Sequence, residues 1–281
     1  MSYRLKTFWH KVCATSLEPS LKPIVFSVAL TAMAVSPMVL AQPVDDDAWH
    51  VSVGIGVTAQ PKYPGSSETR TGAIPVFNAS KGALQIGALP GFGVPLGVGY
   101  TVLREGPWRL GLGIGTSLGS QRTSSDGDAL SRLGEIKQTL SGAVSGSYTE
   151  GAVNASASVI SDLGGQNQGT HALLDVFFRA KPMDKWALHA GPGITLMDKQ
   201  YAQTFYGVTS AQSTSSGYAV HSASAGVSAL RLGAGAVYEM TREWSLGAQL
   251  SVSKLQGDAA KSPAVENSTQ TGYGIFTNYR F

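Results

Sequence analysis

Strict alternation between bulky apolar residues and small or polar residues is the feature that most limits how this chain can fold. From Trp49 to Ala59, one set of positions holds Trp49, Val51, Val53, Ile55 and Val57, and the other holds His50, Ser52, Gly54, Gly56 and Thr58. Side chains two residues apart lie on the same face of a β-strand, so this pattern predicts a strand with one apolar face. The stretch from Thr271 to Phe281 alternates in the same way up to its final aromatic residue.

Two fold classes use many short strands of this kind. A soluble β-sandwich would place the apolar faces in its core, whereas a membrane barrel would turn them toward lipid. After residue 41 the sequence has no run of about 18 apolar residues, which argues against membrane-spanning helices. Residues 42–281 are also rich in Gly, Ser and Ala and poor in charge, which favours the barrel. We therefore expect an all-β fold, a transmembrane antiparallel β-barrel.

Aromatic residues recur at the same position of several predicted strands. "REGPW", "KPMDKW" and "MTREW" each lead through a short turn into a strand that begins on Trp108, Trp186 or Trp244. Trp and Tyr gather where a membrane meets water, so this shared position indicates a girdle at one membrane interface. The aromatic residues expected at the membrane interfaces are Trp49, Trp108, Trp186, Trp244, Tyr279 and Phe281.

Short and long connections alternate along the chain, as they do in outer-membrane barrels. The short ones are 80–82, 104–107, 149–151, 182–185 and 241–243, and the longer ones are 59–72, 120–134, 161–170, 198–226 and 256–268. We interpret the small "PGFG" at 90–93 as a sixth outer connection. Counting it gives about 12 strands with both termini periplasmic. If it is only a bend within one strand, the barrel has 10 strands.

Closure of the barrel gives the last strand a defined place. It should pair with the first strand, so that no sheet edge stays open and Phe281 lies at the periplasmic rim. By analogy with outer-membrane proteins, the final "YRF" is expected to be read by the barrel-assembly machinery.

The first forty-one residues have the pattern of a cleaved export signal. Basic residues precede the apolar run from Ile24 to Val35, and small residues stand before Gln42, so we expect residues 1–41 to be removed and 42–281 to form the barrel. A transmembrane anchor is the alternative, but Pro37 cuts the apolar run short. The leader holds four of the 21 Lys and Arg residues and one of the 18 acidic residues, which leaves 42–281 without net formal charge. Nothing in that balance favours a nucleic-acid partner.

The side of each strand opposite the apolar face should line the lumen. Asp175 and Arg179 lie on one face of the same strand. We expect that face to point into the lumen, because an Arg that faces lipid at mid-membrane costs roughly 2 to 4 kcal/mol. Gly111 and Gly113 leave either a narrow lumen or room for other side chains. Three inward-facing residues that could plug the passage are Phe177, Phe276 and Arg280. The sixth strand is expected to carry Ile136, Gln138, Leu140, Gly142, Val144, Gly146 and Tyr148 on one face.

Residues that could carry chemistry are scattered. The histidines after the leader are His50, His171, His189 and His221, and their spacing is not that of a zinc site. The single cysteine, Cys13, lies in the leader. Ser161, Asp162 and His171 flank one outer loop and could form a hydrolase site, and Asp258, Lys261 and Ser262 could hold a ligand or simply form a tight turn. We expect no catalytic residues, no metal and no cofactor.

Several loops resemble those of the MltA-interacting protein family, also called the MipA/OmpV family, of outer-membrane proteins. "PKYPGS", "FYGVTSAQSTSSGY" and "LQGDAAKSPAVE" are similar to its recognisable loops, and the resemblance extends over the whole chain after the leader. The loop residues that carry it are Tyr63, Gly65, Ser66, Tyr206, Gly207, Val208, Thr209, Gln212, Ser213, Gly257, Asp258, Ala259, Ser262 and Pro263. Lys261 departs from the acidic residue expected there, which weakens any cation role for that loop.

The resemblance implies a non-enzymatic barrel in the outer membrane of a Gram-negative bacterium. In that family the barrel is a scaffold that links a lytic transglycosylase to a murein synthase and so couples peptidoglycan hydrolysis to synthesis. Its partners would be these two enzymes and outer-membrane lipid. The alternatives are a small-solute pore, a surface adhesin and an outer-membrane hydrolase.

Overall fold

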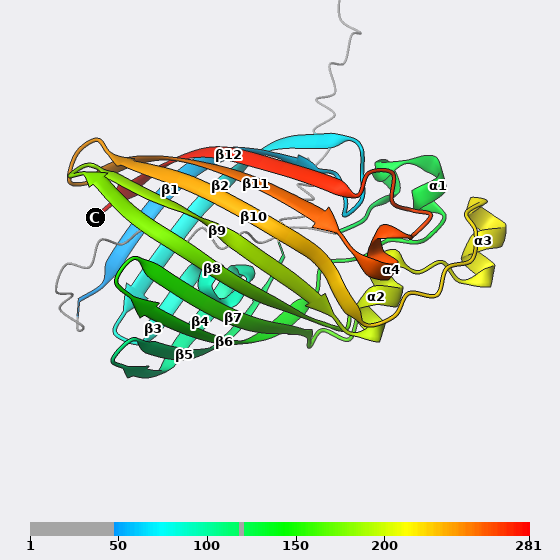
Figure 1. The fold of residues 1–281 in the computed structure, drawn as a ribbon, viewed down its shortest axis with the longest axis horizontal. Coiled ribbons are helices and arrows are strands. Elements are labelled where there is room, and N and C mark those ends of the chain that lie inside the picture. The colour runs from blue at the N-terminus through cyan, green and yellow to red at the C-terminus, as the bar shows by residue number, and fades with distance from the viewer. Residues whose placement is uncertain (1–47, 118–120) are drawn as a thin grey trace, which may run out of the picture.

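Twelve antiparallel strands close into a barrel in the computed structural model, which describes residues 48–117 and 121–281 (Figure 1). Each strand pairs with its neighbours in sequence, and the first strand pairs with the last. The predicted fold class and the count of twelve are therefore confirmed. The expected leader, residues 1–41, lies outside the described residues.

The strands and helices have the following bounds. The strands are β1 (His50–Pro61), β2 (Thr69–Lys81), β3 (Leu84–Leu89), β4 (Val94–Glu105), β5 (Trp108–Thr116), β6 (Leu140–Glu150), β7 (Val153–Asp162), β8 (Thr170–Met183), β9 (Trp186–Met197), β10 (Gly226–Glu239), β11 (Trp244–Leu255) and β12 (Thr269–Arg280). The helices are η1 (Pro90–Phe92), η2 (Ser124–Asp126), α1 (Asp128–Ser131), α2 (Lys199–Tyr206), α3 (Ser210–Ser216) and α4 (Gly257–Ala260).

The two ends of the barrel differ. One end, the short-turn end, carries the turns 82–83, 106–107, 151–152, 184–185 and 240–243, together with the start of β1 and the end of β12. The other end, the long-loop end, carries the connections 62–68, 117–139, 163–169, 198–225 and 256–268. The seam between β1 and β12 runs from the Ser52–Arg280 pair to the Ala59–Tyr273 pair. α1 to α4 gather at the long-loop end (Figure 1).

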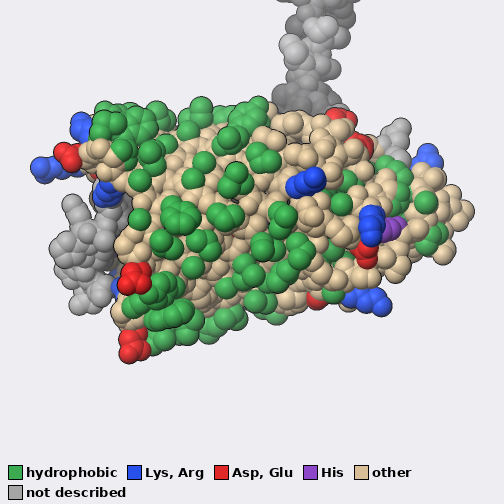
Figure 2. All heavy atoms as spheres, viewed as in Figure 1, with side chains coloured by type: hydrophobic (Ala, Val, Ile, Leu, Met, Phe, Trp, Pro, Cys, Tyr) green, Lys and Arg blue, Asp and Glu red, His purple; other side chains and the backbone are tan. Residues whose placement is uncertain are grey.

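The outer wall of the barrel is apolar. Alternate residues point outward, and large apolar side chains such as Ile55, Leu232 and Ile275 are 58–60% exposed on three different strands. Figure 2 shows apolar side chains spread over the wall and most charged ones toward its two ends. A surface of this extent is a lipid contact rather than the surface of a soluble domain.

Aromatic residues line the outer rim of the short-turn end. Three tryptophans each contact a tyrosine of the neighbouring strand, with ring centroids 4.8 to 5.0 Å apart: Trp108 with Tyr148, Trp186 with Tyr238 and Trp244 with Tyr279. Phe281 packs edge-on against Tyr279, and Trp49 is half exposed. The aromatic positions taken from the sequence thus fall together on one rim.

Two predictions about the connections are wrong. β6 begins at Leu140 rather than at Ile136, because Ile136 pairs with Arg122 inside the preceding loop and is buried. The "PGFG" segment does separate two strands, but it is not an outer loop. It folds into the barrel as η1, where Phe92 is buried.

The inward turn of η1 shortens the pairing between β2 and β3. Only Asn78 to Lys81 of β2 pair with β3, whereas Thr69 to Phe77 pair with β1 alone among the described residues. Pro75 lies in this stretch, and proline, which has no backbone N–H, is tolerated where a strand has an unpaired side. The wall between β2 and β4 is therefore the least bonded part of the sheet.

Candidate functional site

Phe92 divides the lumen. Its ring lies against β4 and β5, where a Cβ atom added to Gly99, Gly111 or Gly113 would come within 2.7 to 3.0 Å of the ring. Glycine at these positions leaves the space that the phenyl ring fills. The ring belongs to a buried layer with Leu89, Val94, Ala143, Ile160 and Leu173.

Local hydrogen bonds hold this layer in place. Gly93 closes the η1 turn in the left-handed region with a φ of 69°, and its N–H donates to the Pro90 carbonyl. The Ser158 hydroxyl donates to the Gly91 carbonyl at 3.0 Å, which ties η1 to β7. The layer that divides the lumen is therefore formed by Phe92 and its neighbours, and it includes none of the three residues predicted to plug the passage, Phe177, Phe276 and Arg280.

A cavity of about 210 Å³ lies on each side of the layer. The outer chamber, toward the long-loop end, is lined by residues that include Gln60, Ser161, His171, Tyr201, Arg231 and Gln270. The inner chamber, toward the short-turn end, is lined by residues that include Gln85, Arg109, Ser147, Asn154, Arg179 and His189. Both Asp175 and Arg179 face the lumen side of β8, as predicted, and Arg179 lines the inner chamber.

A buried ion pair crosses the outer chamber's wall. The Asp175 Oδ1 atom lies 2.9 Å from Arg231 Nη2, and both side chains are less than 10% exposed. Gly193 stands between them in the register, and a Cβ there would lie 2.1 Å from the Asp175 carboxylate. The Arg231 guanidinium also donates to the Ile194 carbonyl at 3.3 Å. The missing side chain at Gly193 lets two charges from non-adjacent strands meet.

The long loops form a cap over the outer chamber. One buried cluster joins Phe205 and Tyr206 of α2 to Ala259 of α4, and a second joins Tyr63 to Leu133, Val208 and Ala264. These residues come from the loops 62–68, 117–139, 198–225 and 256–268. The loop 163–169 is tied to α2, because the Asn167 carbonyl accepts hydrogen bonds from Gln200 and Thr204. All five long loops are connected by packing or hydrogen bonds.

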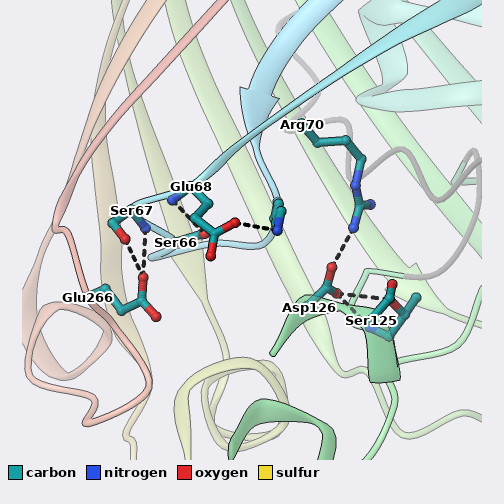
Figure 3. Close-up of polar contacts among 9 residues, drawn as sticks. Ser66, Ser67, Glu68, Arg70, Ser125, Asp126 and Glu266 are labelled. Atoms are coloured by element: carbon teal, nitrogen blue, oxygen red, sulfur yellow. Dashed lines mark hydrogen bonds and ion pairs between the residues drawn. The ribbon is translucent and has the colours of Figure 1, made fainter. Parts of the chain in front are cut away.

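The first family-like loop contacts the last long loop. Gly65 donates its N–H to Gln270 Oε1 at 3.1 Å, and its carbonyl accepts from the backbone N–H groups of Glu266 and Asn267. The Ser67 N–H and hydroxyl both donate to the Glu266 carboxylate (Figure 3). Tyr63 and Ser66 are buried beside these contacts. Figure 3 also shows that Arg70 of β2 reaches Asp126 of η2, which ties a third loop to the first.

The second and third family-like loops pack on each other. The Ser262 hydroxyl donates to the Tyr206 carbonyl at 2.6 Å, and His221 Nε2 lies 2.9 Å from the Asp258 carbonyl. The Asp258 carboxylate accepts from the Ser224 N–H at 3.1 Å. Gly207 and Val208 follow α2 in buried positions. Gly257, Ala259 and Pro263 lie in or beside α4, where Ala259 is fully buried.

A capping box starts α3. The Thr209 hydroxyl accepts from the Gln212 N–H, while the Gln212 side chain accepts from the Thr209 N–H at 2.9 Å. Gln212 also donates to the Leu133 carbonyl at 2.6 Å, and the Ser213 carbonyl accepts from the Gly217 N–H. The loop residues singled out from the sequence therefore contact one another as parts of the cap.

Hydrogen bonds also lower the pKa values of two carboxylates in the cap, Asp258 and Glu266. Those from Ser224 hold the pKa of Asp258 below its usual range, with a smaller effect from the Lys261 ammonium. Those from Ser67 likewise lower the pKa of Glu266. Burial, followed by the nearby Glu266 carboxylate, raises the pKa of Tyr63. At neutral pH both carboxylates are ionised and serve as acceptors for loop N–H groups.

The residues considered for a hydrolase do not assemble into a triad. The Ser161 hydroxyl is hydrogen-bonded to Thr170 at 2.9 Å, and the Asp162 carboxylate accepts from Thr139, Gly164 and Gln168. The His171 ring packs against Tyr201 at 4.8 Å. Within the described ranges, no three His, Cys, Asp or Glu residues are grouped so as to hold a metal ion. The loop residues Asp258 and Ser262 are engaged in the cap contacts described above.

Two residues that shape the lumen were missed from the sequence, namely Phe92 and Arg231. A signal existed for the first of these, since "PGFG" puts a phenylalanine in a turn while Gly99, Gly111 and Gly113 leave space on nearby strands. The Asp175–Arg231 contact could be found only by aligning three strands in register.

Comparisons with known proteins identify a family for this chain. The family model described as "MltA-interacting protein MipA" matches residues 53–281. No curated protein matches the sequence. Among the described residues, none of the helices has both the length and the apolar character needed to span a membrane.

Solved outer-membrane channels resemble the chain at low identity. OmpT of Vibrio cholerae is 10% identical, with a TM-score of 0.37, over 83% of this chain and 97% of that chain. The NanC porin is 11% identical, with a TM-score of 0.40, over 83% of this chain and 100% of that chain. An outer membrane channel from Pseudomonas putida F1 is 14% identical, with a TM-score of 0.38, over 86% and 100%.

Proposed function

This chain belongs to the family described as MltA-interacting protein MipA, and from that membership we propose that it is a scaffold for murein enzymes. The protein is an outer-membrane β-barrel of a Gram-negative bacterium. In the proposed role, it binds a lytic transglycosylase and a murein synthase at its periplasmic end and brings peptidoglycan hydrolysis and synthesis to one place. The enzymes carry the chemistry, and the barrel positions them.

The family match over residues 53–281 is the observation that carries this proposal. The proposed contact surface is the short-turn end, which we place in the periplasm with both termini. Its turns of two to four residues are too short to wrap a partner. Contacts must therefore come from charged and aromatic side chains on the rim, including the exposed Lys181, Lys185 and Arg242.

Affinity capture from detergent-solubilised envelopes tests the scaffold directly. We expect the wild-type barrel to retain a lytic transglycosylase and a murein synthase, identified by mass spectrometry. Reversing three rim charges, K181E, K185E and R242E, should lower the retained amounts, because complementary charge steers and orients association. If the wild-type barrel retains neither enzyme, the scaffold role is wrong.

A matched control changes the same charge at the other end. K137E, K199E and K254E replace exposed lysines near the long-loop end. We expect this variant to retain both enzymes at the wild-type level. Equal loss in the two variants would show that net charge, rather than the short-turn rim, controls retention.

We also propose that residues 1–41 are an export signal that is cleaved after Ala41. The basic start, the apolar stretch and the small residues before Gln42 support this assignment. The intact mass of the protein purified from outer membranes should correspond to residues 42–281. A mass that includes the leader would contradict the assignment.

A further inference from the structure

The inner chamber is lined by positive charge without a neutralising carboxylate. Arg109 of β5 and Arg179 of β8 supply this charge, the His189 ring of β9 also lines the wall, and no Asp or Glu is among the described residues of that wall. The two arginines come from different strands and line the same chamber. Arginine remains protonated in proteins, so both side chains keep their positive charge.

Two other lumen-facing arginines of this barrel each form an ion pair with a carboxylate. Arg231 is 2.9 Å from the Asp175 carboxylate, and Arg280 is 3.2 Å from the Glu239 carboxylate. In the described part of the chain, Arg109 and Arg179 have no such ion pair. Arg109 and Arg179 face the cavity, whereas Arg231 and Arg280 face a carboxylate.

Polar side chains complete the chamber. Ser145 and Ser147 of β6 and Ser156 of β7 line it between the strands that carry the two arginines. Phe92 and Phe177 add apolar surface, and Phe177 packs edge-on against the His189 ring at 5.8 Å. Since the Phe92 layer lies on the outer side, a ligand would enter from the short-turn end.

We propose that the inner chamber binds a small anionic solute, with Arg109 and Arg179 as the charged ligands to its carboxylate or phosphate group. Guanidinium groups donate paired hydrogen bonds to both kinds of oxyanion, and serine hydroxyls suit the remaining polar atoms of the solute. A volume of about 210 Å³ admits a small solute and not a polymer. This site is separate from the rim contacts of the proposed scaffold.

Calorimetric titration of the full mature barrel in neutral detergent tests the site, with citrate and inorganic phosphate as separate probes and glucose as the uncharged control. We expect binding of at least one anion and none of glucose. R109Q and R179Q should each weaken that binding about tenfold or more, since a hydrogen bond between charged groups contributes at least that factor. R179K should also weaken binding, though less than R179Q, because it keeps the charge but cannot donate the paired hydrogen bonds of a guanidinium.

R132Q is the matched control, because Arg132 is an exposed arginine in the 117–139 loop, outside the chamber. It should bind the anions as the wild type does. Heat-dependent mobility on gels identifies variants that have lost the barrel, and R179K then serves in place of R179Q. The proposal is overturned if neither anion binds, or if R109Q and R179Q bind as tightly as R132Q. Which of the two probes binds distinguishes carboxylate from phosphate ligands.

Discussion

Phe92 is a single side chain whose removal should change what can cross the barrel. Its ring fills the space over Gly99, Gly111 and Gly113 and separates the two chambers. Phe92→Ala should join the chambers and raise single-channel conductance in a planar bilayer above that of the wild type. It should also destabilise the barrel by about 3 to 5 kcal/mol, as loss of a buried phenyl ring does.

The matched control for this change is Phe178→Ala. Phe178 is 58% exposed on the outer face of β8, so its removal leaves the lumen unchanged. Conductance of this variant should equal that of the wild type. If Phe92→Ala also conducts no more than the wild type, Phe92 is not the barrier and the cap closes the passage by itself.

The Asp175–Arg231 ion pair should affect the stability of the barrel because both side chains are buried. Asp175→Asn leaves the Arg231 charge buried without a carboxylate, which typically costs about 3 to 5 kcal/mol. The double variant Asp175→Leu with Arg231→Leu removes both charges and should lose much less stability. Urea unfolding in detergent measures both. Equal losses would show that packing rather than charge sets the cost at this position.

At the scale of elements, the cap should loosen in acid. Asp258 and Glu266 have pKa values below their usual ones in the folded cap, so each contributes stability when ionised and loses it as the pH falls through its folded pKa. We expect hydrogen exchange in α4 and in the 62–68 loop, corrected for its intrinsic pH dependence, to increase below about pH 4. Asp258→Asn with Glu266→Gln should exchange faster at neutral pH and respond less to acid.

Glu135→Gln is the control for the cap. Glu135 is exposed in the 117–139 loop, at the same end of the barrel. Its replacement should leave the acid response as in the wild type. If hydrogen exchange in the cap still increases in acid after both Asp258 and Glu266 are replaced, other titratable groups cause the increase.

Elements whose conformation depends on nearby residues in the sequence could be predicted, and those that depend on contacts between distant segments could not. The strands from His50 and Thr269 follow from alternation within ten or so residues, and the sequence was sufficient for them. Ile136 also fits an alternating pattern, but its burial against Met197 and Ala202 decides its conformation. Phe92 depends on glycines that only the closed barrel brings beneath it. The cap and the inner chamber are likewise products of several strands and loops meeting.

For the whole molecule, orientation in the membrane decides which surface each proposal can use. The scaffold requires the short-turn end to face the periplasm, and the anion chamber opens to the side that this end faces. The single cysteine of the chain, Cys13, lies within the proposed leader, so a mature barrel would contain only the cysteines that are introduced. Ala211 of α3 and Asp184 of the 184–185 turn are exposed at opposite ends and suit single substitutions.

Labelling of intact cells with a membrane-impermeant maleimide then reports the orientation. Ala211→Cys should be labelled on intact cells, because the long-loop end faces outward in the proposed arrangement. Asp184→Cys should react only after the outer membrane is permeabilised. The reverse pattern would place the short turns on the cell surface, where no murein enzyme could reach them. The scaffold role would then be wrong, while the inner chamber would open to solutes outside the cell. A periplasmic protein that carries a cysteine serves as the integrity control and should stay unlabelled on intact cells. Labelling of that protein would show that the outer membrane was permeable during the measurement.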